Sequence, residues 1–297
     1  MAKFMIVAQA TQGGVRARAI LPVVERAKAS FRPTRSKGQC FLQDPVYIER
    51  IIEALAPQAD ETLIEIGPGT GNLTFPIARR GTRVLAIEHD DHLAHELELH
   101  ADDRIEVVRG DATQLDLAAF LEPRGIDKVR VVGNLPYSVS APILLRLLAH
   151  ISRIHSMLLM FQKEVAERLV ATPGTKDYGS LSVLTQQATS PKLLFLVPGR
   201  AFRPKPRVVS AVVSFQPRGS HAPDVGDVPT FRALVRALLA HRRKTIANNI
   251  KHLGASPLTA EMLRQALEQT GVDPTRRAET MSVEEFANLS RICTPTA

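Results

Sequence analysis

Three glycines and an acid are spaced so that they could hold a nucleotide-sized ligand. Residues 62–72 read TLIEIGPGTGN, in which Gly67, Gly69 and Gly71 directly follow an apolar run. Glycine lets the backbone approach a ligand closely and adopt positive φ angles, and the start of a following helix presents free N–H groups. The next apolar run ends in Glu88, and an acid at the end of a second strand can bind the two hydroxyls of a ribose.

Two further polar groups follow predicted strands later in the chain. Asp111 comes after residues 105–108, and the sequence GNLPY at 133–137 comes after residues 128–132. Ligands of an open parallel sheet lie at the carboxyl ends of its strands, so four successive polar strand ends predict a single site. Taken alone, Asp111 could instead be a helix N-cap, and Glu88 could be a solvated surface acid.

Predicted strands and helices alternate around these groups. The predicted strands are 62–65, 83–88, 105–108, 128–132, 157–161, 193–197 and 208–215, and the predicted helices are 45–55, 73–78, 90–100, 115–121, 142–149, 163–170 and 180–188. This alternation predicts an α/β fold with a mostly parallel sheet covered by helices on both faces. Residues 216–229 have the composition of a linker, and helical periodicity over 231–253 and 259–270 then predicts a small all-α C-terminal domain.

The composition indicates which kinds of partner and which cellular compartment suit the protein. The 297 residues carry a net charge of +8 and a pI near 9.8, which favours an acidic partner such as nucleic acid. Residues 1–35 are rich in Arg and Lys and predict a flexible basic arm, with an organelle transit peptide as the alternative. Cys40 and Cys293 are too far apart to indicate a disulfide framework or a metal site, and no apolar run is long enough to span a membrane.

Two motifs resemble those of methyltransferases. The spacing Gly67-x-Gly69-x-Gly71, with Glu65 as the leading acid, departs from the dinucleotide fingerprint and resembles the turn of class I S-adenosylmethionine-dependent methyltransferases. The sequence Asn134-Leu135-Pro136-Tyr137 resembles the Asn/Asp-Pro-Pro-Tyr motif of amino-group methyltransferases that act on nucleic-acid bases.

The second motif suits a poor nucleophile. The lone pair of an exocyclic base amine is delocalised into the ring, so groups that accept its N–H bonds can turn that lone pair towards a methyl donor. The amide oxygen of Asn134 and the carbonyl of Leu135 are such acceptors, and Pro136 fixes φ so that this carbonyl faces the site. Tyr137 offers a ring on which the base can stack. The remaining catalysis would be proximity between the nitrogen and the methyl group.

Eight sequence blocks together resemble the ribosomal RNA adenine dimethyltransferases, which place two methyl groups on each of two adjacent adenines near the 3′ end of small-subunit rRNA. In order these are GQCFLQD, EIGPGTGNLT, GDAT, GNLPYSVSAPIL, FQKEVAERL, TPGTKDYGSLSVL, FRPKPRVVSAVV and HRRKTIANNI. The NLPY, TPGTKDYG and HRRKT blocks favour the small-subunit enzyme over the 23S rRNA and mitochondrial transcription-factor relatives. The resemblance implies a Rossmann-like class I methyltransferase domain with a seven-stranded sheet over 36–217 and a helical RNA- or ribosome-binding domain over 230–297.

The resemblance also implies roles for individual residues. S-adenosylmethionine would be bound by Gln39, Cys40, Leu42, Gly67, Gly69, Glu88, Asp111 and Asn134. Glu88 would hold the ribose hydroxyls and Asp111 would accept from the adenine amine of the cofactor. The catalytic set would be Asn134, Leu135, Pro136, Tyr137 and Phe202, with Tyr137 and Phe202 on either side of the target adenine. The family usually has Asn at the position of Cys40, and a thiol is a weaker hydrogen-bonding group, so cofactor affinity should fall if that side chain is used.

Basic residues on two loops and in the helical region are the expected RNA contacts. They are Lys176, Arg203, Lys205, Arg207, Arg242, Arg243 and Lys244. Prolines keep the loop at 198–207 stiff, so its cations can be presented at a small cost in ordering entropy. Any one of these charges alone could be an ordinary solvated residue, and the cluster carries the prediction.

The sequence therefore predicts an rRNA adenine N6-dimethyltransferase that acts on a pre-ribosomal small subunit as a cytoplasmic monomer, without a metal or a membrane. One alternative is a ribosome-assembly factor in which methylation is secondary or lost, and the substitution at Cys40 is the residue that hints at it. The other is a dinucleotide-dependent oxidoreductase, which the glycine spacing and the GNLPY motif oppose.

Overall fold

The structure is a computed structural model that describes residues 40–253 and 258–294. The predicted basic arm over 1–35 and the predicted cofactor contact Gln39 lie outside the described residues. No helix in the described ranges is both long enough and apolar enough to cross a membrane.

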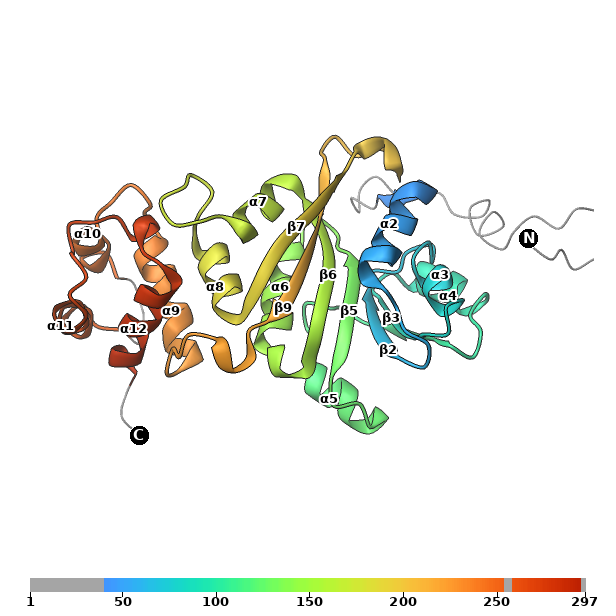
Figure 1. Cartoon of the computed structure of the whole chain (residues 1–297), viewed down its shortest axis with the longest axis horizontal. Helices are drawn as coiled ribbons and strands as arrows, with labels where there is room; N and C mark the ends of the chain where they lie inside the picture. The colour runs from blue at the N-terminus through green and yellow to red at the C-terminus, as the bar shows by residue number, and fades with distance from the viewer. Residues whose placement is uncertain (1–39, 254–257, 295–297) are drawn as a thin grey trace, which may run out of the picture.

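Strands and helices alternate from the start of the described chain and give way to helices at its end (Figure 1). The strands are β1 (Phe41–Leu42), β2 (Thr62–Ile66), β3 (Arg83–Glu88), β4 (Ile105–Arg109), β5 (Val129–Asn134), β6 (Ile154–Gln162), β7 (Thr189–Val197), β8 (Phe202–Arg203) and β9 (Ser210–Pro217). The α-helices are α2 (Pro45–Leu55), α3 (Thr74–Ala78), α4 (Asp91–Glu98), α5 (Leu117–Leu121), α6 (Ser140–Ala149), α7 (Lys163–Val170), α8 (Ser180–Ala188), α9 (Val228–Leu239), α10 (Ile246–Ile250), α11 (Ala260–Thr270) and α12 (Val283–Cys293).

The main sheet of the described chain has seven strands in the order β4-β3-β2-β5-β6-β9-β7. The first five of these run parallel, and β9 is antiparallel to both β6 and β7. The predicted mostly parallel, seven-stranded sheet is therefore confirmed. Strand order reverses between β2 and β5, and at such a point the carboxyl ends of neighbouring strands open a crevice for a ligand.

Alternating side chains of the strands fill two apolar cores, one on each face of the sheet. Ile64 of β2 and Leu85 of β3 belong to the core beneath α5 and α6, whereas Leu63 and Val84 belong to the core beneath α2 and α3. Successive strand residues point to opposite faces, so strands buried on both faces are continuous apolar runs. This explains why these strands were recognisable from sequence.

The start of the described chain is fixed beside a loop far away in sequence. Phe41 of β1 pairs with Arg203, and Leu42 pairs with Phe202, in a two-stranded antiparallel sheet. The helix α2 follows immediately, and Asp44 is its N-cap, with the side chain accepting from the Val46 amide. The pairing of β1 with β8 was not predicted, because two-residue strands carry no periodic pattern.

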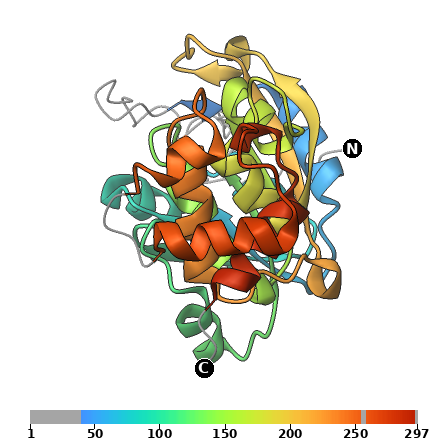
Figure 2. The ribbon, with the colours of Figure 1, turned by 90° about the vertical axis from the view of Figure 1, so that its left-hand side faces the viewer.

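The C-terminal helices share their core with an earlier part of the chain. Tyr178 and two residues of α8, Val183 and Leu184, are buried in the same apolar cluster as residues of α9 to α12. Figure 2 views this helical end of the molecule. The boundary placed between residues 217 and 230 is thus crossed by a continuous core.

Two features of the helical region differ from the sequence-based expectation. The periodic run 231–253 is not one helix, since α9 ends at Leu239 and α10 begins at Ile246, where the Thr245 hydroxyl accepts from the Asn248 amide. The helix α12 was missed altogether. Its start has a capping box, Ser282 with Glu285 three residues later, which is a sequence signal for a helix N-terminus.

Candidate active site

The glycine turn after β2 needs its glycines for both conformation and packing. Gly67, Gly69 and Gly71 have φ angles of 69°, 56° and 77°. A Cβ on Gly69 would lie 2.8 Å from the Phe41 ring, and one on Gly71 would lie 2.3 Å from the Phe75 ring. Larger residues would therefore be strained here and would collide with aromatic rings.

Glu88 is held against this turn at the end of β3. The residue is 7% exposed, and its two carboxylate oxygens accept from the backbone amides of Gly69 at 3.1 Å and Asp90 at 2.9 Å. Burial raises the pKa of Glu88, and these two amides act in the opposite direction. Each carboxylate oxygen can accept more than one hydrogen bond, so Glu88 is oriented and still able to bind hydroxyl groups.

Glu65 lies fully buried behind the same turn. Its Oε2 atom has no hydrogen-bond partner among the described residues, and Glu65 lines a small pocket together with Gly67, Asn72 and Asn134. Desolvation, with a smaller contribution from the charge of Glu88, raises the pKa of Glu65 to about 7, although the Thr74 side chain lowers it. A buried carboxyl oxygen without a partner is costly, which makes this position suited to a cationic group of a ligand.

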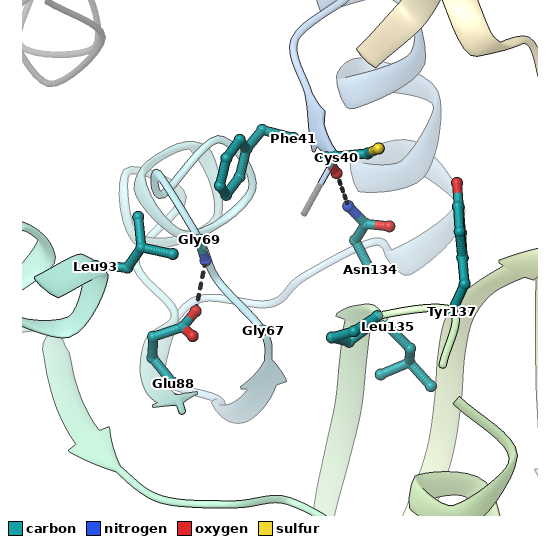
Figure 3. Close-up of a pocket in the computed structure, with 10 residues that line it drawn as sticks. Cys40, Phe41, Gly67, Gly69, Glu88, Leu93, Asn134, Leu135 and Tyr137 are labelled. Carbon is teal, nitrogen blue, oxygen red and sulfur yellow. Dashed lines mark hydrogen bonds between the residues drawn. The ribbon is translucent and has the colours of Figure 1, made fainter. Parts of the chain in front are cut away.

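Asn134 ends β5 with its side-chain amide fixed. The Nδ2 atom donates to the backbone carbonyl of Cys40 at 3.3 Å. Figure 3 shows that the amide oxygen then lies on the side of Tyr137, where it can accept a hydrogen bond. The residue at position 40 thus acts through its backbone, and no hydrogen bond of its thiol is part of this contact.

Tyr137 lies beside Asn134, and its hydroxyl forms a hydrogen bond. The Tyr137 hydroxyl and the Ser210 hydroxyl lie 2.7 Å apart, and Ser210 is buried at the start of β9. Burial of the ring raises the pKa of Tyr137. The side chain is half-buried and lines the pocket, so its ring is positioned for stacking while the phenol stays neutral.

One open pocket of about 500 Å³ joins these groups (Figure 3). It is lined by Cys40, Phe41, Gly67, Gly69, Glu88, Leu93, Asn134, Leu135, Pro136 and Tyr137. Eight of these ten were predicted as site residues from the sequence. Phe41 and Leu93 were missed, since apolar side chains in a pocket cannot be told from core residues by pattern.

Two predicted cofactor contacts lie away from this pocket. Leu42 is buried in β1, and its carbonyl accepts from the Asn72 side chain at 2.6 Å. Asp111 is exposed, and its carboxylate accepts from the Thr113 amide at 2.8 Å, which lowers the pKa of Asp111. Asp111 is not the N-cap of a helix, since Asp116 caps α5.

Phe202 does not stand opposite Tyr137 in this arrangement. Its ring is fully buried in the core beneath α2, and β8 holds it beside Leu42. Of the two rings expected to sandwich the target base, Tyr137 lines the pocket and Phe202 does not, so in this structure the two rings do not face each other. A buried aromatic of a short paired strand and an exposed stacking aromatic look alike in a sequence.

The predicted RNA contacts fall into two groups of differing availability. The exposed ones are Arg203, Lys205 and Arg207, on the loop between β7 and β9, together with Lys176 and Arg243. Lys244 is half-buried. Arg242 is already engaged by an ion pair with Glu279 at 3.0 Å. Figure 1 shows the loops that carry these residues along its upper side, where β6 ends.

The described residues offer no group of three or more His, Cys, Asp or Glu side chains that could hold a metal ion.

Comparisons with known proteins agree with this geometry. The family model for ribosomal RNA adenine dimethylase matches residues 30–294. The chain is 41% identical to ribosomal RNA small subunit methyltransferase A of Geobacillus thermodenitrificans, over 91% of this chain and 94% of the other. It is 42% identical to the protein of the same name from Myxococcus xanthus, over 89% and 92% of the two chains.

Solved structures show the same fold. A dimethyladenosine transferase from Plasmodium falciparum matches with a TM-score of 0.69 and 23% identity, covering 84% of this chain and 95% of the other. The 23S rRNA methyltransferase ErmE matches with a TM-score of 0.61 and 24% identity, covering 85% and 99%. Because the family model spans most of the chain, the chain belongs to the ribosomal RNA adenine dimethylase family.

Proposed function

We propose that the pocket between Glu88 and Tyr137 is where S-adenosylmethionine and a target adenine of small-subunit rRNA meet. As a member of its family, the chain is an S-adenosylmethionine-dependent rRNA adenine dimethyltransferase. The observation that carries the residue-level proposal is the fixed amide of Asn134, whose oxygen faces Tyr137 within the pocket that also contains Glu88.

The residues present fit the cofactor. Glu88 combines burial with spare acceptor capacity, as binding of ribose hydroxyls requires. S-adenosylmethionine carries two positive charges at neutral pH, on its sulfonium and its α-amino group. The partnerless Oε2 of Glu65, close to Gly67, is an acceptor suited to that cationic end. We assign both acids to cofactor binding, together with Cys40, Gly67 and Gly69.

The reaction needs a nucleophilic amine in line with the donor. When bound, S-adenosylmethionine supplies an electrophilic methyl group. The chain contributes acceptors for the N6 hydrogens, namely the Asn134 amide oxygen and the Leu135 carbonyl. These acceptors favour a pyramidal nitrogen, whose lone pair points towards the methyl group and is no longer delocalised into the ring. Tyr137, held by Ser210, supplies the stacking surface that keeps the flipped base in place. Fixed groups of this kind act mainly through orientation.

The finer details of the substrate rest on sequence resemblance and on the names of the relatives. We propose that the enzyme acts on two adjacent adenines near the 3′ end of the small-subunit rRNA, within a pre-ribosomal particle. The proposal assigns the α/β part up to residue 217 to methyl transfer and the helices after residue 230 to RNA or ribosome binding. It also takes the enzyme to be a cytoplasmic monomer, which sedimentation and cell fractionation would test.

The alternative is a ribosome-assembly factor in which methylation is secondary or lost, and its one residue-level hint was Cys40. The contact between Asn134 and the carbonyl of this residue supports the enzyme instead, because that contact does not depend on the thiol. The oxidoreductase alternative is wrong, because the chain belongs to a methyltransferase family.

The decisive experiment is transfer of labelled methyl groups to unmethylated small subunits and to protein-free rRNA, followed by mapping of the modified bases. Asn134→Ala is the matched control. We expect dimethylated adenine on the assembled substrate and none with the control. Absence of transfer by the intact enzyme to either substrate would favour the assembly factor.

A further inference from the structure

One arginine of the helical region bonds to two other segments of the chain. Arg242 Nε donates to the Glu279 carboxylate at 3.0 Å. Its Nη1 atom donates to the Lys176 carbonyl, and its Nη2 atom donates to the Thr175 carbonyl at 3.3 Å. A single guanidinium therefore joins the loop at 172–179 to the turn that contains Glu279.

The same loop is attached at two further points. The Gly174 amide donates to the backbone carbonyl of Glu279 at 2.8 Å. Tyr178, near the end of the loop, is fully buried in the apolar cluster formed with α9 to α12. The loop leaves the methyltransferase sheet after α7, yet its contacts are made with the helical region.

The three cations at this junction differ in availability. Arg242 is neutralised by Glu279, although its side chain is 42% exposed. Lys176 and Arg243 are exposed, and neither forms an ion pair with a described residue. A phosphate that approached this surface would find the charges of Lys176 and Arg243 free, and that of Arg242 already paired.

We propose that Arg242 is a positioning residue: it fastens the loop at 172–179 to the helical region, so that Lys176 and Arg243 form one phosphate-binding surface. The proposal rests on the RNA-binding role assigned above to Lys176 and Arg243, and it removes Arg242 from the set of direct contacts. It also explains why this loop, although polar and exposed, has a defined shape.

The geometry requires arginine. A guanidinium is planar and carries five N–H donors in a rigid fork, so it can bond to a carboxylate and to two carbonyls at once. A lysine has the same charge but a single ammonium at the end of a flexible chain. Arg242→Lys thus separates charge from positioning.

The first test compares Arg242→Lys with wild type, and uses Arg264→Lys on α11 as the matched control. We expect Arg242→Lys to weaken binding of unmethylated small subunits by about fivefold or more, since several hydrogen bonds are lost. Amide hydrogen exchange at residues 174–178 should become faster, with S-adenosylmethionine affinity unchanged as a check on folding. Wild-type affinity and exchange in Arg242→Lys would overturn the proposal.

The second test asks whether Glu279→Gln strengthens or weakens RNA binding. Glu279→Gln removes one negative charge near the RNA surface, so electrostatics alone predicts tighter RNA binding. Positioning by the Arg242–Glu279 pair predicts the opposite, weaker binding together with faster exchange at 174–178. Tighter binding by Glu279→Gln would overturn the proposal.

The attachment of the loop and the methyltransferase activity are tested by separate measurements. Hydrogen exchange of the loop needs no RNA, so it reports on the attachment alone. Faster exchange without loss of RNA affinity would overturn the role of the loop in RNA binding, while methyl transfer by the wild type would still stand.

Discussion

The side-chain amide of Asn134 donates to the backbone carbonyl of Cys40 across 3.3 Å, which joins the end of β5 to a residue 94 positions earlier in the chain. Because the bond uses the amide nitrogen, the amide oxygen of Asn134 is available to accept from the substrate. Because it uses the backbone of Cys40, it does not depend on which side chain occupies position 40.

Replacement of Cys40 should have little effect on cofactor binding. The contact with Asn134 uses the carbonyl, which Cys40→Ala and Cys40→Asn both retain. We expect calorimetric S-adenosylmethionine affinities within about threefold of wild type, less than the loss of a neutral hydrogen bond would cause. A larger loss in Cys40→Ala would show that the thiol itself contacts the cofactor.

Substitution of Asn134 should affect the chemical step. Asn134→Ala removes the amide oxygen that accepts from the adenine amine, and we expect the rate of methyl transfer in single turnover to fall by about a hundredfold or more. Asn134→Asp keeps an acceptor but loses the donor to Cys40, so it should retain more activity than Asn134→Ala. Equal rates for both variants would argue against the acceptor role.

Tyr137 should contribute to catalysis through its ring and to stability through its hydroxyl. Tyr137→Phe removes only the bond to Ser210, so it should lower the free energy of unfolding by about 1 kcal/mol and leave base stacking intact. Tyr137→Ala removes the ring and should weaken binding of the target base by about 1–3 kcal/mol, measured with a fluorescent adenine analogue in the RNA. A loss of base binding in Tyr137→Phe as large as in Tyr137→Ala would contradict this division.

Features that depend on residues close together in the sequence could be predicted, whereas features that depend on distant residues could not. The strands and the glycine turn were recognisable because continuous apolar runs and three spaced glycines carry their own signals, and the GNLPY motif placed Asn134 correctly. The order of the strands, by contrast, brings Glu88 and Asn134 together only in three dimensions.

The settings that could not be predicted from the sequence share a physical origin in long-range contacts. Phe202 looks like an exposed stacking ring until β1 pairs with β8 and buries it. Arg242 looks like its neighbour Arg243 until Glu279, 37 residues away, is found beside it. No periodicity within the chain distinguishes a free cation from a paired one, so these roles required the structure.

Glu65 provides the last prediction, a dependence of stability and binding on pH. Its pKa in the folded protein is raised from 4.5 to about 7, mainly by desolvation. Between these two values the folded protein keeps a proton that the unfolded chain has lost, so the free energy of unfolding should fall as pH rises through this window. The full penalty, present above pH 7, is of the order of 3 kcal/mol.

Glu65→Gln should remove this penalty, because a neutral amide of similar shape has no charge to desolvate. We expect its melting temperature to exceed that of the wild type at pH 8 and to approach it at pH 5, with Glu53→Gln on the exposed face of α2 as the control. In the wild type, S-adenosylmethionine affinity should rise with pH as Glu65 ionises opposite the cationic end of the cofactor, and this rise should be absent in Glu65→Gln. A parallel pH dependence of both proteins would show that Glu65 titrates outside this range.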